Sequence, residues 1–409
     1  MDKNIVIEKE KREAPQSRIV NPEPNDIRIK KCRYFNNYQT CATLMLDDLS
    51  LTALDDDGSI KPWSDWGFRL NSEGSMFRYL EDNLLKKYPE VKGTFFFPIG
   101  KHAAMHHNAG YRLHFNEMNE SFKCFANEMS NRFEIAFHGT NHGRYKDNNN
   151  PSMSNWDQEF EYLTLDNIPA LAREIERVED FLGIKMHGGK YPGYRMNGDS
   201  KKIVESLGFK WWCSHDSMIN RKHNDNRHYY FGEENRVLGF PTNLSGCVFN
   251  HHLKSGFAPG SFTQRLRREF RMIRFENYIR YLYKKGLIIS IQEHHFCLRT
   301  DGKRQTPNAF DDINSLDMIF GFLRGADIWY ATCSEIAHYL ESYDHTDVEK
   351  QSNGNVILKY NGRWDEPLIT LKSNCRQLQN VSTGEILPGV YRQGEWLYNG
   401  IKEGEYKTI

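Results

Sequence analysis

Short apolar runs alternate, from about residue 40 to residue 342, with segments whose apolar residues recur every three or four positions. The runs are typical of buried β-strands, and the recurrence is typical of amphipathic helices. The expected strands are Ala42–Asp47, Gly93–Pro98, Phe133–His138, Phe209–Ser214, Val237–Phe240, Leu287–Gln292 and Ile328–Thr332. The expected helices are Asn167–Leu182, Ser200–Leu207, Thr263–Lys285 and Ser334–Tyr343. This alternation predicts an α/β fold of parallel βαβ units, in an open sheet or in a barrel.

Two of the expected helices carry end signals. Gly183 directly follows the helix that ends at Leu182, and glycine readily takes the left-handed conformation that ends a helix. Asp199 directly precedes the helix that begins at Ser200, so we expect its carboxylate to cap the first turn.

The pattern changes beyond about residue 350, where short strand-like runs are split by Asn-Gly, Thr-Gly and Pro-Gly turns. These runs are Asn355–Tyr360, Leu368–Leu371, Arg376–Asn380, Val390–Arg392 and Glu395–Tyr398. They predict a small antiparallel, sandwich-like β domain over residues 350–409. Residues 1–39 are expected to form an N-terminal arm or an edge strand, and residues 40–345 the α/β domain.

The charge balance of the chain disfavours nucleic acid and membrane surfaces as partners. Lysine and arginine number 54, against 54 acidic residues, so the formal net charge is zero. Such a chain has no general field for binding nucleic acid or an anionic lipid surface. We expect no membrane span, because no apolar run approaches about 18 residues. Residues Met1–Glu8 contain no apolar segment typical of a signal peptide, and the eight cysteines form no CxxC pair, so a cytoplasmic location with reduced thiols is expected.

Two of the expected strands end in residues that bind metal ions. Asp47 and Asp48 follow one apolar run, and His138 and His142 follow another. Sites in parallel α/β folds form at the carboxyl ends of strands. Alone, an Asp-Asp pair is more often a turn or helix cap, and two histidines four positions apart are as often surface residues. Together, a carboxylate and two imidazoles with positions open to water suit a hydrolytic Zn²⁺ ion.

The combination resembles the polysaccharide deacetylase family, also called carbohydrate esterase family four or the chitooligosaccharide deacetylase homology domain. The first motif of that family corresponds to Met45-Leu46-Asp47-Asp48-Leu49, and the second to His138-Gly139-Thr140-Asn141-His142. The run Gly93–Pro98 is similar to the second strand of the family. The resemblance covers about Thr40 to Tyr343 and implies a distorted (β/α) barrel of about seven parallel strands. It does not extend to the N-terminal arm or to the C-terminal β domain.

The resemblance also implies roles for individual residues. Asp48, His138 and His142 would bind a divalent metal ion, with Zn²⁺ favoured over Co²⁺, Ni²⁺ or Mn²⁺. Asp47 would be the general base.

The remaining motifs match less closely. In the third, Lys190 stands where the family has an arginine, and Arg195 lies one short loop further on; lysine does not offer the bidentate fork of arginine. Asp216 is the candidate acidic residue of the fourth motif. His294, rather than His295, is the candidate general acid of the fifth.

The expected function is therefore a metal-dependent hydrolase that removes an N-acetyl group from a carbohydrate, such as a soluble or surface-polysaccharide precursor. One alternative is an amidase or cyclic-imide hydrolase that acts on a small non-sugar molecule. Another is a carbohydrate-binding barrel that has lost catalysis. The C-terminal β domain is a candidate surface for oligomer formation.

Overall fold

The computed structural model describes residues 27–49, 76–100, 120–143, 158–213, 227–233, 236–253, 262–294 and 306–409 of the chain. The chain forms two compact units. The first comprises Met1–Cys41, Arg324–Trp329 and Glu335–Ile409, and the second comprises Ala42–Leu323 and Tyr330–Ser334. The domain boundaries expected from the sequence stay a prediction.

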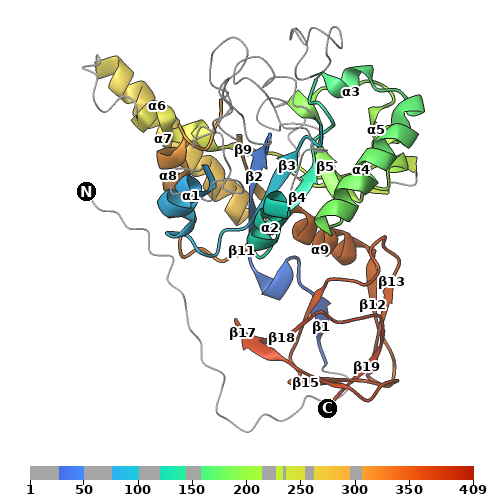
Figure 1. Ribbon diagram of the computed structural model, residues 1–409. Coiled ribbons are helices and arrows are strands. Elements are labelled where there is room, and N and C mark those ends of the chain that lie inside the picture. The colour runs from blue at the N-terminus through green and yellow to red at the C-terminus, as the bar shows by residue number, and fades with distance from the viewer. Residues whose placement is uncertain are drawn as a thin grey trace. The chain divides into compact units, whose positions relative to one another are not determined.

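The second unit is built on a curled sheet whose strands follow the order β7-β8-β6-β5-β4-β3-β2-β10-β9, with β11 paired to β2 (Figure 1). The strands are β2 (Thr40–Asp47), β3 (Gly93–Phe97), β4 (Phe133–Phe137), β5 (Gly188–Lys190), β6 (Trp211–Cys213), β7 (Tyr229–Phe231), β8 (Val237–Gly239), β9 (Leu244–Ser245), β10 (Ile289–His294) and β11 (Ile328–Tyr330). Neighbouring strands from β8 to β9 run parallel, and β7 is antiparallel to β8. The predicted α/β fold with a distorted barrel of parallel strands is confirmed. The sequence pattern missed β5, β7 and β9.

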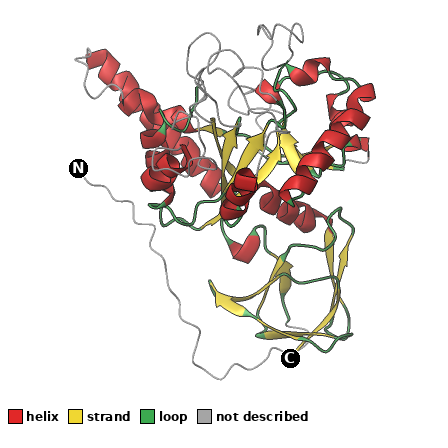
Figure 2. Cartoon of the chain, in the orientation of Figure 1, coloured by secondary structure: helices red, strands yellow, loops and turns green. Residues whose placement is uncertain are grey.

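Helices lie on both sides of this sheet (Figure 2). They are α1 (Met76–Leu80), α2 (Glu120–Met129), α3 (Glu159–Tyr162), α4 (Ile168–Leu182), α5 (Ser200–Ser206), α6 (Asn250–Leu253), α7 (Phe262–Lys284) and α8 (Ile313–Leu323). Shorter helical segments are η4 (Glu81–Leu85), η7 (Leu165–Asn167), η8 (Pro192–Tyr194) and η10 (Gly246–Phe249). The expected helices correspond to α4, α5, α7 and a further helix, α9 (Cys333–His345), whereas α1, α2, α3, α6 and α8 were not expected.

The two predicted helix ends have different outcomes. Gly183 has a φ of 67° and its N–H bonds to the Glu179 carbonyl, so this C-terminal cap is confirmed. The capping role expected for the Asp199 side chain is wrong. The Asn197 Oδ1 atom instead accepts hydrogen bonds from the Asp199 and Ser200 N–H groups, at 2.9 and 3.1 Å. Asn197, three residues before the first residue of the helix, thus satisfies the N–H groups of Asp199 and Ser200, whereas a side-chain cap at Asp199 would accept from N–H groups further into the first turn.

The first unit contains two antiparallel sheets, in agreement with the predicted C-terminal β structure. One has the order β1-β14-β18-β17 and the other β12-β13-β19-β15-β16. Their strands are β1 (Ile29–Lys31), β12 (Thr346–Lys350), β13 (Val356–Tyr360), β14 (Thr370–Ser373), β15 (Gln377–Asn380), β16 (Ile386–Pro388), β17 (Val390–Arg392), β18 (Glu395–Asn399) and β19 (Gly404–Thr408). The core of this unit consists of Val356, Leu358, Ile369, Leu371, Leu378, Tyr398, Ile401 and Tyr406. Most of α9 (Cys333–His345) and the short η2 (Phe35–Asn37) also belong to it, and β1 is an edge strand.

The described residues bear on two expectations from the sequence, the reduced cysteines and the lack of a membrane span. The cysteines that the structure describes are all free thiols. Among the described helices, none combines the length and the apolar character that crossing a membrane requires. The cytoplasmic location and the oligomer remain predictions.

Glycine in β5 makes room for two neighbouring tryptophans. A Cβ atom at Gly188 would lie 2.2 Å from Trp211 Cδ2, and one at Gly189 would lie 2.5 Å from Trp212 Cζ3. Both indole rings are fully buried, so neither can move away cheaply. The strand that ends in Lys190 therefore needs two residues without side chains.

We expect Gly188→Ala to lower the free energy of unfolding by about 1–3 kcal/mol, because the added methyl group overpacks the site against Trp211. Gly198→Ala is the matched control, since no heavy atom lies within 4 Å of its Cβ position. Urea denaturation of both variants measures the difference. Equal stability of the two variants would contradict the packing argument.

Candidate active site

The sheet places four polar residues at the carboxyl ends of neighbouring strands. Asp47 ends β2 and is in register with His294, which ends the parallel strand β10. His138 directly follows β4, and Lys190 ends β5. Because the sheet order is β5-β4-β3-β2-β10, residues up to about 250 positions apart in sequence meet at one edge.

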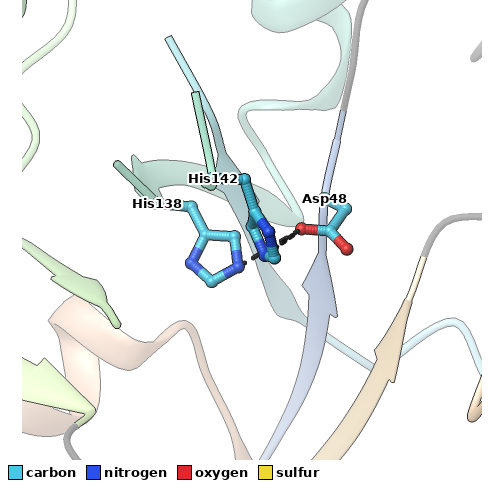
Figure 3. Close-up of side chains that lie close together, drawn as sticks. All are labelled: Asp48, His138 and His142. Carbon is cyan, nitrogen blue, oxygen red and sulfur yellow. Dashed lines mark ion pairs between the residues drawn. The ribbon is translucent and has the colours of Figure 1, made fainter. Parts of the chain in front are cut away.

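Asp48, His138 and His142 form a buried cluster (Figure 3). The Nε2 atoms of His138 and His142 lie 3.3 and 3.0 Å from Asp48 Oδ1. One ligand atom from each of the three residues lies within 4.8 Å of the others. The three residues that the motifs predicted as metal ligands therefore converge.

The chemistry of this cluster fits a divalent cation. The His138 Nδ1 atom lies 3.0 Å from the Lys190 carbonyl oxygen, which can only accept, so Nδ1 carries the hydrogen. In a neutral ring, Nε2 then presents a lone pair to a carboxylate oxygen of Asp48, and two acceptors need a cation or a proton between them. Nitrogen and oxygen ligands at about 2.0–2.2 Å from a tetrahedral Zn²⁺ ion lie about 3.3–3.6 Å apart, which is close to the observed spacing.

The backbone around the histidines is held by a buried carboxylate. Glu159 accepts hydrogen bonds from the N–H groups of Thr140, Asn141 and His142 at 2.8, 3.0 and 2.7 Å. The Thr140 hydroxyl donates a further bond to it at 2.6 Å. A Cβ atom at Gly139, where φ is +80°, would lie 2.4 Å from Glu159 Oε2, so only glycine fits there.

Two of the predicted ligands have strained backbones. Asp48 and His142 both have a φ of 62°, in the left-handed region that costs a residue with a side chain about 1 kcal/mol or more. At His142, the hydrogen bond from its N–H group to Glu159 helps to hold this conformation. Strain of this kind often accompanies functional sites, which agrees with a ligand role.

Asp47 lies in a network of donors. The Lys190 Nζ atom lies 2.9 Å from its Oδ1 and 2.7 Å from its Oδ2. The Gln292 amide donates to Oδ2 at 3.1 Å, and the Tyr194 hydroxyl donates to the Gln292 carbonyl oxygen at 2.7 Å. The ammonium group also lies over the rings of Phe96 and Tyr194. Lys190 is fully buried, so it is not an exposed loop lysine.

His294 lies on the other side of Asp47. Its Nε2 atom is 3.8 Å from Asp47 Oδ2, and its Nδ1 atom is 2.7 Å from the Pro307 carbonyl oxygen. That carbonyl fixes the hydrogen on Nδ1, so Nε2 is the atom that gains or loses a proton. Burial lowers the pKa of His294, and the negative charges of Asp47 and Asp48 partly oppose this effect.

The other predicted residues lie elsewhere or outside the described residues. Arg195 is exposed, and its Nη1 atom lies 3.5 Å from Glu161 Oε1. Asp216 and His295 lie outside the described residues. The catalytic roles of Arg195 and Asp216 stay predictions.

Sequence reasoning missed three residues that shape the site: Glu159, Tyr194 and Gln292. Glu159 acts through backbone N–H groups, which leave no mark on the side-chain pattern. Gln292 does carry a signal, because it alternates with buried apolar residues along β10 and lies two positions before His294.

Known proteins are similar to this chain in structure rather than in sequence. No model of a protein family matches the sequence, and no curated protein matches it. A probable polysaccharide deacetylase from Pseudomonas aeruginosa PAO1 is similar in structure, with a TM-score of 0.44, 15% identity, and 75% of this chain and 93% of that chain covered. The Puue allantoinase has a TM-score of 0.43 and 15% identity over 75% of this chain and 92% of its own. A pseudoenzyme of the CE4 family from Bacillus anthracis has a TM-score of 0.33 and 13% identity, with 73% of this chain and 65% of that chain covered.

Polysaccharide deacetylases are thus among the structures to which the chain is similar, as the motifs predicted. At these identities and TM-scores, the activities of those proteins do not carry over to this chain. The chemistry of the site has to be inferred from its own residues.

We expect Glu159→Gln to weaken Zn²⁺ binding about 10- to 100-fold, because the amide cannot accept hydrogen bonds at both positions and the loop that carries both histidines loosens. Competition with a chromophoric chelator measures the affinity. Glu161→Gln is the matched control, because its side chain is partly exposed and lies against Arg195. Equal affinities of the two variants would contradict the role of Glu159.

Proposed function

We propose that the chain is a metal-dependent hydrolase that removes an N-acetyl group from a carbohydrate. The observation that carries the proposal is the buried cluster of Asp48, His138 and His142 directly beside Asp47. One carboxylate and two imidazoles leave coordination positions open to water and substrate, as hydrolytic Zn²⁺ sites do. Zn²⁺ is therefore the proposed ion, and Co²⁺, Ni²⁺ and Mn²⁺ would suit the same donors less specifically.

The metal ion supplies two effects when it is bound: it lowers the pKa of a coordinated water, and it polarises the acyl oxygen. The remaining chemistry belongs to side chains. Asp48, His138 and His142 would hold the ion at the carboxyl ends of the strands. Their burial keeps the surrounding dielectric constant low, which strengthens each electrostatic interaction at the reacting atoms.

Asp47 is the proposed general base. As the water oxygen bonds to the acyl carbon, a carboxylate oxygen of Asp47 takes the water proton. Lys190 and Gln292 hold that carboxylate from two sides, so it does not rotate when the proton arrives. The ammonium group of Lys190 also balances the negative charge that the base carries before the reaction.

His294 is the proposed general acid. Its Nε2 atom gives a proton to the nitrogen of the leaving amine as the carbon–nitrogen bond breaks, and acetate and a free amine are released. The hydrogen bond from Nδ1 to the Pro307 carbonyl keeps Nε2 directed to the site. The lowered pKa makes this imidazolium a stronger acid than a free one.

The sugar substrate rests on the motif resemblance, and a soluble or surface-polysaccharide precursor is the proposed source. One observation favours a second candidate, an amidase or cyclic-imide hydrolase on a small non-sugar molecule. Lys190 stands where the deacetylase motif has arginine, so the site departs from the pattern next to the base. A barrel without catalysis is disfavoured, because the three ligand residues and the base lie together.

We expect the purified protein to contain one equivalent of divalent metal and to release acetate from at least one N-acetylhexosamine compound. Asp48→Ala should lose both metal and activity, because it removes the only carboxylate of the described cluster. Asp47→Asn should keep the metal and lose turnover, which makes it the matched control. Elemental analysis and an acetate assay give the two readouts.

Hydrolysis of hydantoins or ureides, without acetate release from sugars, would replace the first candidate with the second. Full activity of Asp48→Ala would contradict both.

We expect His294→Gln to lower kcat for an N-acetyl sugar by about 10²- to 10⁴-fold, because the amine departs only after protonation. The same variant should retain most activity toward 4-nitrophenyl acetate, whose phenolate leaves without a proton. Steady-state kinetics with both substrates test this difference. Equal losses on the amide and the ester would contradict the acid role.

A further inference from the structure

The long helix α7 carries an exposed apolar stripe. Leu266, Phe270 and Ile273 are 41%, 68% and 46% exposed. They are spaced by four and three positions, so they lie on one face of the helix. Ile279 and Leu282, on the opposite face, are buried at 3% and 0%. The apolar stripe is therefore an exposed face of α7, and the C-terminal half of the same helix packs through the opposite side.

Arginines flank one side of the stripe. The segment Phe262–Lys284 contains six arginines and one lysine but two glutamates, in a chain whose total charge is zero. Arg267, Arg271 and Arg274 are exposed and alternate with the apolar residues along the helix. Within the part of the chain that the structure describes, these three guanidinium groups form no ion pair. Although the net charge of the whole chain is zero, α7 itself is strongly basic.

The helix also projects from its surroundings. In Figure 1, α7 (yellow) reaches outward beyond the other described helices of its unit, and its N-terminal end is the farther one. Leu266 to Ile273 span about 10 Å of this projecting part at 1.5 Å per residue.

We propose that the N-terminal half of α7 docks on a bilayer surface rich in anionic phospholipid. A helix with apolar residues on one face and arginines beside them lies in the plane of the membrane interface. The apolar side chains enter the boundary of the acyl chains, and the guanidinium groups bind lipid phosphates. This attachment does not depend on the proposed reaction.

A second copy of the chain fits the stripe less well. Helix pairing through the stripe would bring the arginines of two copies together, and like charges repel. Three side chains over about 10 Å also bury far less than the roughly 800 Å² per partner of a stable interface. Nucleic acid would use the arginines but leave Phe270 and its apolar neighbours in water.

The test is sedimentation of the full-length protein with sucrose-loaded vesicles. Vesicles of phosphatidylcholine with phosphatidylglycerol are compared with vesicles of phosphatidylcholine alone. The wild-type protein should bind the anionic vesicles at least about tenfold more strongly, and 0.5 M NaCl should weaken this binding. Equal binding to both kinds of vesicle, or none to either, would overturn the proposal.

Two variants separate the contributions of charge and apolar contact. Arg267→Glu/Arg271→Glu/Arg274→Glu and Phe270→Ser/Ile273→Ser should each lower binding to anionic vesicles at least about tenfold. Their matched controls change exposed residues elsewhere: Arg173→Glu/Lys202→Glu/Arg324→Glu for charge, and Leu165→Ser/Met196→Ser for apolar surface. Circular dichroism confirms that each variant is folded.

Loss of binding in the α7 variants only would support the proposal. An equal loss in the controls would assign binding to net charge and overturn it. A wild-type dimer in analytical ultracentrifugation that Phe270→Ser/Ile273→Ser dissociates would also overturn it, because the stripe would then belong to a second copy.

Discussion

Two adjacent aspartates are buried side by side at the end of β2. The residues around them offset the unfavourable free energy of burying two carboxylates. Asp47 and Asp48 are 2% and 0% exposed. Buried carboxylates are unfavourable unless cations or donors neutralise them. Asp47 contacts Lys190 and Gln292, while Asp48 faces the two imidazoles. The left-handed backbone at Asp48 lets the two carboxylates contact different partners, so one turn of the chain separates the proposed base from the proposed metal ligand.

The sequence predicted the strands that bury bulky side chains on both faces. In β2, all eight residues are buried, and the uninterrupted apolar run revealed it. The pattern failed at β5, because Gly188 and Gly189 carry no side chains that could form a pattern. There the bulk belongs to Trp211 and Trp212 on the neighbouring strand. A sequence pattern depends on the side chains of the strand itself. A strand of glycines that packs against large side chains of its neighbour therefore shows no pattern.

The residues of the candidate site also fall into those that the sequence indicates and those that only the fold reveals. Asp47, Asp48, His138 and His142 could be named as candidates because possible metal ligands stand at or shortly after the ends of apolar runs. Glu159 could not, because it supports the histidine loop through backbone N–H groups. Such a contact depends on where the polypeptide chain passes and not on which side chains it carries. Short motifs therefore reveal candidate reacting groups, whereas the groups that position them emerge only from the fold.

Lys190 shows how the site can depart from the motif and still hold the proposed base, Asp47. An arginine would offer a planar fork to the carboxylate, whereas the compact ammonium of Lys190 reaches both oxygens of Asp47 from one point, at 2.9 and 2.7 Å. One point of contact leaves the carboxylate free to tilt, and the Gln292 amide removes that freedom by donating from the other side. Tyr194 in turn fixes Gln292 through its carbonyl oxygen. Lysine from β5 and glutamine from β10 together provide the two directions of constraint that one guanidinium would supply.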